Sequence, residues 1–161
     1  MRSKVDVKKH SPKLTHCAGR LLELFFDSFA EILPSATIDI GYSSVNGEKS
    51  ELDLTCMSPS EQIHIHIESK PEGVELRFSE PGARGVASVL FFMHPLNFHR
   101  TCEAAVDFVA KIARGDIVIA REKKRSFPIF GAKRLRFFEN GEIIGSADKV
   151  EKTLIWKKLN V

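Results

Sequence analysis

The fold is decided by residues 36–78, which read ATIDIGYSSVNGEKSELDLTCMSPSEQIHIHIESKPEGVELRF. Apolar side chains occupy every second position in four short runs of this stretch: Ile38, Ile40 and Tyr42; Leu52, Leu54 and Cys56; Ile63, Ile65 and Ile67; Val74, Leu76 and Phe78. A period of two is typical of a β-strand that has one face in a core and the other in water. Turn-forming sequences separate the runs at Asn46-Gly47, Ser58-Pro59-Ser60 and Pro71-Glu72-Gly73. We therefore predict an antiparallel meander of at least four strands with one apolar face.

A helix is predicted before the meander. Ser11-Pro12 is a typical helix start, because serine caps the N-terminus and proline is favoured at the first helical position. Apolar residues then recur every three or four positions until Pro34 ends the pattern. We predict a helix over about residues 12–33 and expect it to cover the apolar face of the meander. Residues 1–10 are polar and basic and are expected to form a flexible arm.

A second helix is predicted after the meander. Thr101 is expected to cap it and Gly115 to end it. Its apolar face is expected to contain Ala105, Phe108, Val109 and Ile112. The apolar stretch before it does not fit one period, so the sequence leaves the state of residues 86–95 open.

Short strands complete the expected fold. We predict strands at 117–119 and around Leu135 and Phe137, then a turn at Asn140-Gly141 leading into another strand at 143–144. Residues 148–161 fit either a strand or the end of a short helix. The expectation is a single α+β domain over residues 1–161 in the order α-ββββ-α-β(ββ), with the meander packed against both helices.

Composition favours an ordinary globular protein in a reducing compartment. Apolar residues make up 43% of the chain and charged residues 28%, which argues against disorder. The longest apolar run, Val86 to Met93, is far shorter than the roughly 20 residues that span a bilayer. The charged N-terminus does not resemble a secretory signal. Cys17, Cys56 and Cys102 are odd in number and lie in apolar patterns, so we expect buried reduced thiols. The expected location is cytoplasmic, without membrane contact.

Charge is unevenly distributed along the sequence. Residues 21–110 contain five Lys or Arg against fourteen acids, whereas residues 111–136 contain nine against two. The basic region is a candidate for binding phosphates or a protein partner through Arg121, Lys123, Lys124, Arg125, Lys133, Arg134 and Arg136. Neighbouring phenylalanines, such as Phe137, favour base stacking if they are exposed. The alternative is a solvated turn with its phenylalanines in the core, because Leu135 and Phe137 alternate with charged residues.

The solvent-exposed face of the meander is expected to be acidic. Its predicted acidic side chains are Asp39, Glu51, Asp53, Glu68 and Glu75. Such a face fits a basic partner protein, and the alternative is a solvated sheet face without a specific role.

The most specific chemical pattern is His64-Ile65-His66, followed by Glu68. Alternate positions on a strand point to the same face about 7 Å apart, so these three side chains are weak candidates for zinc or iron ligands. A solvent-facing histidine pair without a metal is the favoured interpretation, and no cofactor is expected. The sequence contains no phosphate-binding loop, dinucleotide fingerprint or nucleophile elbow, so we do not expect an enzyme.

Three functional hypotheses remain open, and two of them are favoured. The first is a non-catalytic protein-binding module. The size and element order resemble those of some bacterial immunity proteins, and this resemblance implies a protein that neutralises a toxin by covering or flanking its active site. The second hypothesis is a nucleic-acid-binding domain that uses the basic region 111–136. A metal-dependent enzyme using His64 and His66 is the third and least favoured.

Overall fold

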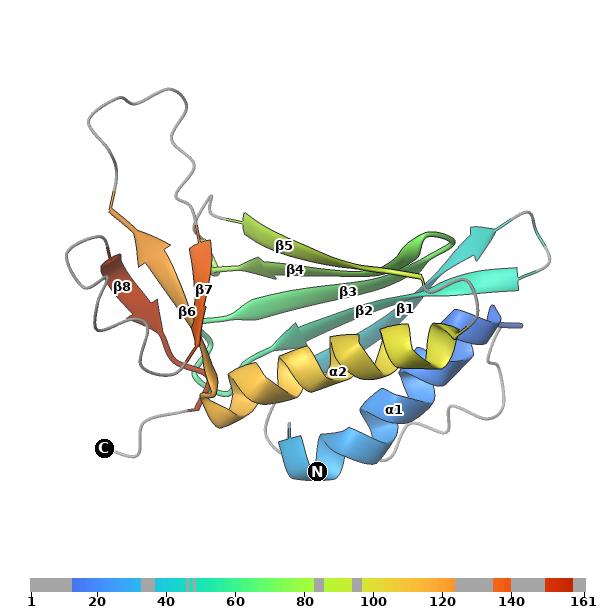
Figure 1. The fold of residues 1–161 in the computed structure, drawn as a ribbon, viewed down its shortest axis with the longest axis horizontal. Coiled ribbons are helices and arrows are strands. Elements are labelled where there is room, and N and C mark those ends of the chain that lie inside the picture. The colour runs from blue at the N-terminus through green and yellow to red at the C-terminus, as the bar shows by residue number, and fades with distance from the viewer. Residues whose placement is uncertain are drawn as a thin grey trace, which may run out of the picture.

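The protein is an α+β structure in which helices, strands and turns follow the predicted order (Figure 1). The computed structural model describes residues 13–32, 37–45, 47, 49–82, 86–93, 97–123, 135–139 and 150–157. The elements in these ranges are α1 (His16–Ile32), β1 (Thr37–Val45), β2 (Lys49–Met57), β3 (His64–Lys70), β4 (Gly73–Ser79), β5 (Val86–Phe92), α2 (Phe98–Arg114), β6 (Ile117–Glu122), β7 (Leu135–Glu139) and β8 (Val150–Leu154). No helix within the described ranges combines the length and apolar character needed to cross a membrane. The expected arm at residues 1–10 lies outside these ranges.

The predicted meander is confirmed and is one strand longer than the four clear runs. Strands β1 to β5 pair in sequential order, and each pair is antiparallel. The state of β5 was left open because apolar residues lie on both of its faces. Val89 and Phe91 pack towards the core, whereas Leu90 and Phe92 are exposed on the other face. Alternation therefore fails as a signal in this strand.

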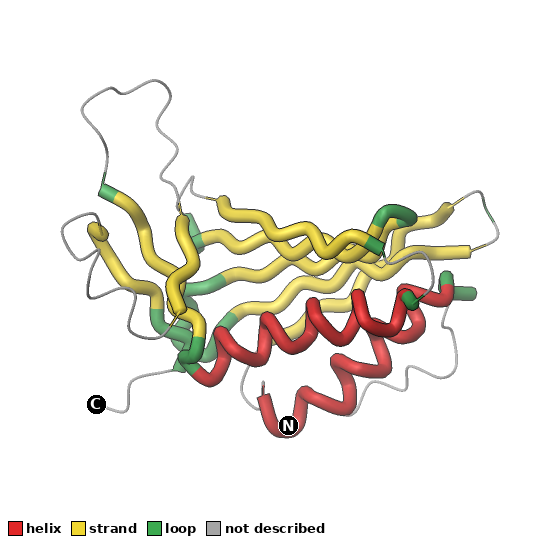
Figure 2. Tube along the Cα trace, in the orientation of Figure 1, coloured by secondary structure: helices red, strands yellow, loops and turns green. Residues whose placement is uncertain are grey.

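Both helices lie on one face of the five-stranded sheet, as the tube view shows (Figure 2). The core between the two layers contains fully buried side chains from both helices and from β2, β3 and β4, including Phe25 of α1, Leu54 of β2 and Val109 of α2. Burying each large apolar side chain contributes roughly 1.5–3 kcal/mol relative to exposure. The helices thus cover the apolar face of the meander, as the sequence predicts.

The start of α1 differs from the prediction. The helix begins at His16, and Thr15 acts as its N-cap, because the Ala18 N–H donates to Thr15 Oγ1 at 3.2 Å. The preceding segment is extended alongside β2: the Thr15 N–H donates to Ser50 O at 3.0 Å, and the Ser50 N–H donates to Lys13 O at 2.8 Å. A helix from residue 12 is therefore wrong, because these backbone groups bond to a strand. Ser11-Pro12 lies outside the described residues.

The limits of α2 are partly as predicted. Gly115 ends the helix with a left-handed φ of 87°, as expected. Asn97, and not Thr101, caps its start, because the Asn97 side chain accepts from the Arg100 N–H. Thr101 is buried in the first turn, where its hydroxyl donates to Phe92 O at 3.2 Å. The hydroxyl that the sequence assigns to a cap therefore fastens the helix to β5.

A second antiparallel sheet, in the order β7-β6-β8, packs at one end of the sandwich (Figure 1). Phe137 of β7 makes edge contacts with Phe78 of β4 and Phe108 of α2, at centroid distances of 5.0 and 5.3 Å. Phe137 is half-buried and packs against the core, so its ring contacts other aromatic side chains of the protein. In the C-terminal segment, for which the sequence allowed either a strand or a helix end, Val150–Leu154 forms a strand. The predicted turn at Asn140-Gly141 and strand at 143–144 lie outside the described residues.

Candidate binding surface on the open face of the sheet

The face of the five-stranded sheet opposite the helices is covered by neither of them, and we call it the open face (Figure 1). Strand register arranges its side chains in rows that cross the sheet. One row is Gly41, Asp53, Glu68, Glu75 and Leu90, and the next is Asp39, Thr55, His66, Arg77 and Ser88. Lys70 and Phe92 lie beyond the first row, and His64 lies beyond the second.

Three carboxylates stand side by side in the first row. Asp53 is the cross-strand partner of Glu68, and Glu68 is the partner of Glu75. Like charges directly opposite one another are destabilising, so this row requires compensation. Arg77 supplies it: Nη2 lies 2.7 Å from Glu68 Oε2, and Nε lies 3.0 Å from Glu75 Oε1. Lys70 also contacts both glutamates.

This pairing lowers the pKa of Glu75. Hydrogen bonds from Arg77 and then from Lys70 hold the pKa of the Glu75 carboxyl at about 2, against the ordinary value of 4.5. The sequence predicted an acidic face, but the open face also contains cations that pair with its carboxylates. It is a network of alternating charges in which two cations bind two of the three carboxylates.

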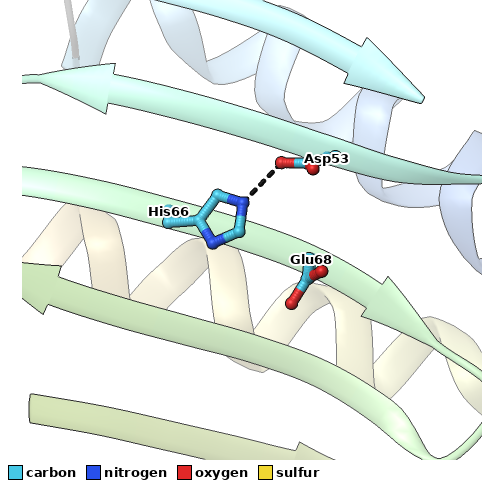
Figure 3. Close-up of side chains that lie close together, drawn as sticks. All are labelled: Asp53, His66 and Glu68. Atoms are coloured by element: carbon cyan, nitrogen blue, oxygen red, sulfur yellow. Dashed lines mark hydrogen bonds and ion pairs between the residues drawn. The ribbon is translucent and has the colours of Figure 1, made fainter. Parts of the chain in front are cut away.

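Three side chains that could together hold a metal ion, Asp53, His66 and Glu68, lie close to one another towards the β2 end of this row. His66 Nε2 is 2.5 Å from Asp53 Oδ1, and the Glu68 side chain lies close to both residues (Figure 3). One ligand atom from each of the three residues lies within 4.8 Å of the other two. His64 shares the open face, as predicted, but it is not part of this group. Asp53 takes its place, because the β2–β3 register brings it opposite Glu68.

Two exposed apolar side chains adjoin the charged rows. Leu90 is 38% exposed and Phe92 is 74% exposed, and both project from β5 on the open face. Leu90 is the direct partner of Glu75, and Phe92 is the partner of Gly73. These residues were missed because the state of β5 was left open. The signal was present in the run of apolar residues from Val89 to Phe92, which has no hydrophilic side to offer water.

Glu51 does not belong to this surface, so its predicted exposure is wrong. It is buried, with 6% of its surface exposed, and it accepts hydrogen bonds from Thr15 Oγ1 at 2.9 Å and from Ser69 Oγ. The extended segment before α1 brings the Thr15 hydroxyl to this carboxylate, which the alternation along β2 alone does not reveal. Asp39 is exposed on the open face as predicted.

The basic region is engaged in ion pairs where the structure describes it. Arg121, whose side chain is only 14% exposed, donates to the carboxylate of Glu80 and also contacts Glu151. Burial alone would raise the pKa of Glu80, but the hydrogen bonds from Arg121 and the nearby Lys152 outweigh it, so the pKa is lowered. The side chain of Arg121 therefore ties the smaller sheet to the end of β4.

Arg136 and Lys123 are more accessible than Arg121. Arg136 Nη1 lies 2.9 Å from Glu122 Oε1, and its guanidinium lies 5.5 Å from the centre of the Phe138 ring. Lys123 is exposed. Lys124, Arg125, Lys133 and Arg134 lie outside the described residues. Two of the three described basic candidates are thus paired with carboxylates.

The three cysteines are buried free thiols, as predicted. Cys17 of α1 and Cys102 of α2 are 85 positions apart, yet their sulfur atoms lie 3.6 Å from each other. This hydrogen bond and burial raise the pKa of the Cys17 thiol. Burial raises the pKa of Cys56 to about 12. The Cys17 and Cys102 thiols thus lie in contact where the two helices pack inside the core.

A separate hollow of about 190 Å³ lies between the end of α2 and the smaller sheet. Its walls are mainly apolar, with Leu154 and Trp156 among them, and Arg114 and Lys157 also contribute. The carbonyl end of α2 is partially negative and opposes the charge of these two cations. The hollow therefore does not define one class of ligand.

Comparisons of the chain with protein-family models, curated proteins and solved structures found no match.

Proposed function

We propose that this chain is a non-catalytic protein-binding module and that the open face of the five-stranded sheet is its binding surface. The observation that carries the proposal is the 74% exposure of Phe92 beside an ordered array of charged side chains. Large aromatic side chains next to organised polar groups are typical of the residues that dominate protein–protein interfaces. Exposed apolar groups in a continuous patch also favour an interaction surface over a solvated face.

The chemistry of the open face defines the partner. Phe92 and Leu90 require an apolar pocket or groove on the partner surface. Asp39 and Asp53 lie on β1 and β2, towards the edge of the sheet opposite β5, and favour lysine or arginine there. The proposed partner is therefore a protein with an apolar recess flanked by basic side chains. Toxin neutralisation by an immunity-type protein is the specific form of this role that the element order suggests.

The decisive test compares two phenylalanines on opposite sides of the molecule. The partner is captured from the native cell, identified and purified, and its affinity is measured for the wild type, Phe92→Ser and Phe26→Ser. Phe26 is a matched control because it is 44% exposed but lies on α1, behind the sheet. We expect Phe92→Ser to weaken binding at least tenfold, about 1.4 kcal/mol, and Phe26→Ser to leave it unchanged.

Two results would overturn the proposal. One is equal affinity of the Phe92→Ser and wild-type proteins for an identified partner. The other is tight oligonucleotide binding at about 150 mM salt that is lost in Lys123→Ala, since phosphate contacts dominate nucleic-acid binding. If the partner is a toxin, its activity is expected to fall in proportion to the complex formed, and Phe92→Ser should restore that activity.

A further inference from the structure

We propose that Asp53, His66 and Glu68 form a binding site for a divalent transition-metal ion, best tested with Zn²⁺. The three side chains offer one imidazole nitrogen and two carboxylate oxygens from adjacent strands (Figure 3). Imidazole and carboxylate are the usual nitrogen and oxygen ligands of zinc, and three protein ligands plus water is a common arrangement. This site goes beyond the protein-binding role and does not depend on it.

The backbone already holds the ligands in place. Asp53 and Glu68 are direct partners in the antiparallel β2–β3 ladder, so their Cβ atoms are expected about 4.5–5.5 Å apart. His66 precedes Glu68 by two positions and therefore shares its face. All three belong to the interior of a five-stranded sheet, which is a more rigid support than a loop.

The present spacing of the ligand atoms suits a zinc ion after small side-chain rotations. Zinc–ligand bonds of about 2.0–2.2 Å place neighbouring ligand atoms of a tetrahedron roughly 3.3–3.6 Å apart. The spacing between Asp53 and His66 is 2.5 Å, and all three ligand atoms lie within 4.8 Å of one another. The side chains are 39, 28 and 23% exposed for Asp53, His66 and Glu68, so an ion held there keeps a position open to water.

The charges of the row also favour a cation at this end. Asp53, Glu68 and Glu75 carry three negative charges, against two positive charges on Lys70 and Arg77. Both cations contact Glu68 through Oε2, at 2.7 Å from Arg77 and 3.4 Å from Lys70. Glu68 Oε1 is thus the oxygen to bind the metal. The excess negative charge lies at Asp53, next to His66.

Arg77 is expected to limit the affinity. Its guanidinium is a positive charge beside one ligand, and it repels a metal ion at short range. Removing this charge leaves Glu68 and Glu75 as adjacent carboxylates without their main counter-ion, and a bound metal ion then replaces part of the lost compensation. Arg77→Gln should therefore bind metal more tightly than the wild type.

The experiment measures Zn²⁺ binding to the full chain by isothermal titration calorimetry after removal of any affinity tag. We expect one ion per chain, with affinity reduced at least tenfold in His66→Gln and in Asp53→Asn, because even losing an outer partner of a ligand costs 10–100-fold. His64→Gln is the matched control, since His64 lies on the same strand and face, and its affinity should equal that of the wild type. Thermal unfolding without metal checks that each variant folds.

Each remaining outcome is informative. A gain of affinity in Arg77→Gln that disappears in the double variant Arg77→Gln/His66→Gln supports the site. Equal binding by His66→Gln and wild type overturns it, as does an equal loss in His64→Gln. Binding that is abolished by thiol alkylation but unaffected by His66→Gln assigns the metal to cysteine and also overturns the proposal. The partner affinities of the protein-binding test are to be measured in a buffer that contains a metal chelator, so failure of this site is distinguishable from failure of the protein-binding proposal.

Discussion

The two faces of the five-stranded sheet are built by the same alternation but held in different ways. On the face covered by the helices, side chains such as Leu54, Ile65 and Leu76 are fully buried, and any one of them contacts many similar neighbours. On the open face, each charged side chain depends on a particular partner across the strands, as Arg77 does on Glu68 and Glu75. Burial is non-directional, whereas an ion pair requires the correct register.

This difference separates stability from recognition. The covered face supplies most of the favourable free energy of folding, because apolar burial is the dominant stabilising contribution. The open face contributes little of this kind, and its partly exposed charges and two exposed apolar groups are available to a partner or an ion. A change of the same chemical size should therefore have very different consequences on the two faces.

The largest expected effect is the difference in stability between two variants that each lose one phenylalanine ring, one on the covered face and one on the open face. Phe78→Ala removes a fully buried ring that contacts Phe108 and Phe137, and it should destabilise the fold by about 3–5 kcal/mol. Phe92→Ala removes a ring that is 74% exposed, and it should change stability by less than about 0.5 kcal/mol. Urea denaturation followed by circular dichroism measures both. Similar losses for the two variants would show that the open face is part of the core.

The covered face was well predicted because it follows from local periodicity. Alternation over residues 36–78 identified four strands, and spacing of three or four identified both helices. Single-residue details failed where a distant segment intervened. The helix start at residue 12 and the exposure of Glu51 were both wrong for one reason: residues 13–15 pair with the start of β2, and no local pattern contains that contact.

The open face was predicted only in outline, because its arrangement depends on pairing between strands. His66 and Glu68 were recognised as neighbours on one strand, but Asp53 replaces His64 as their partner only through the β2–β3 register. Similarly, the proximity of Cys17 and Cys102 depends on how α1 packs on α2. Phe92 remained unassigned because a strand with two apolar faces has no alternation to detect. Local sequence gives the side of a strand, and the fold alone gives its neighbours.

An intermediate effect is expected at Thr15, where a carboxylate lies on the covered side of the sheet. Thr15→Ala removes the acceptor for the Ala18 N–H and the donor to Glu51, which is 6% exposed. Losing a helix cap and one hydrogen bond to a buried charge should cost about 2 kcal/mol. Thr15→Ser is the control, because it keeps the hydroxyl, and it should lose well under half of that amount. If Thr15→Ser is as unstable as Thr15→Ala, the methyl group and not the hydrogen bonds stabilises this corner.

The smallest expected effect is the pH dependence that Glu75 of the open face gives to stability. The folded pKa of Glu75, about 2, is lower than its ordinary value of 4.5, so its stabilising contribution is complete above pH 4.5 and is lost as the pH falls towards 2. A difference of this size corresponds to about 3 kcal/mol at 1.36 kcal/mol per pKa unit, and screening by solvent and salt is expected to reduce it to about 1 kcal/mol.

Comparing the wild type with Glu75→Gln isolates this contribution. Denaturation midpoints should differ at pH 7 and converge as the pH falls towards 2, because the wild-type carboxyl becomes increasingly protonated and then resembles the amide. Added salt should narrow the gap at pH 7, since the Arg77 and Lys70 side chains are partly exposed. The difference in denaturation midpoint between the wild type and Phe78→Ala does not depend on a carboxyl group, so it should persist at low pH and at high salt. If the midpoint difference for Glu75→Gln also persists at low pH and high salt, the side chains of the open face are stabilised by packing, as on the covered face, and not by their charges.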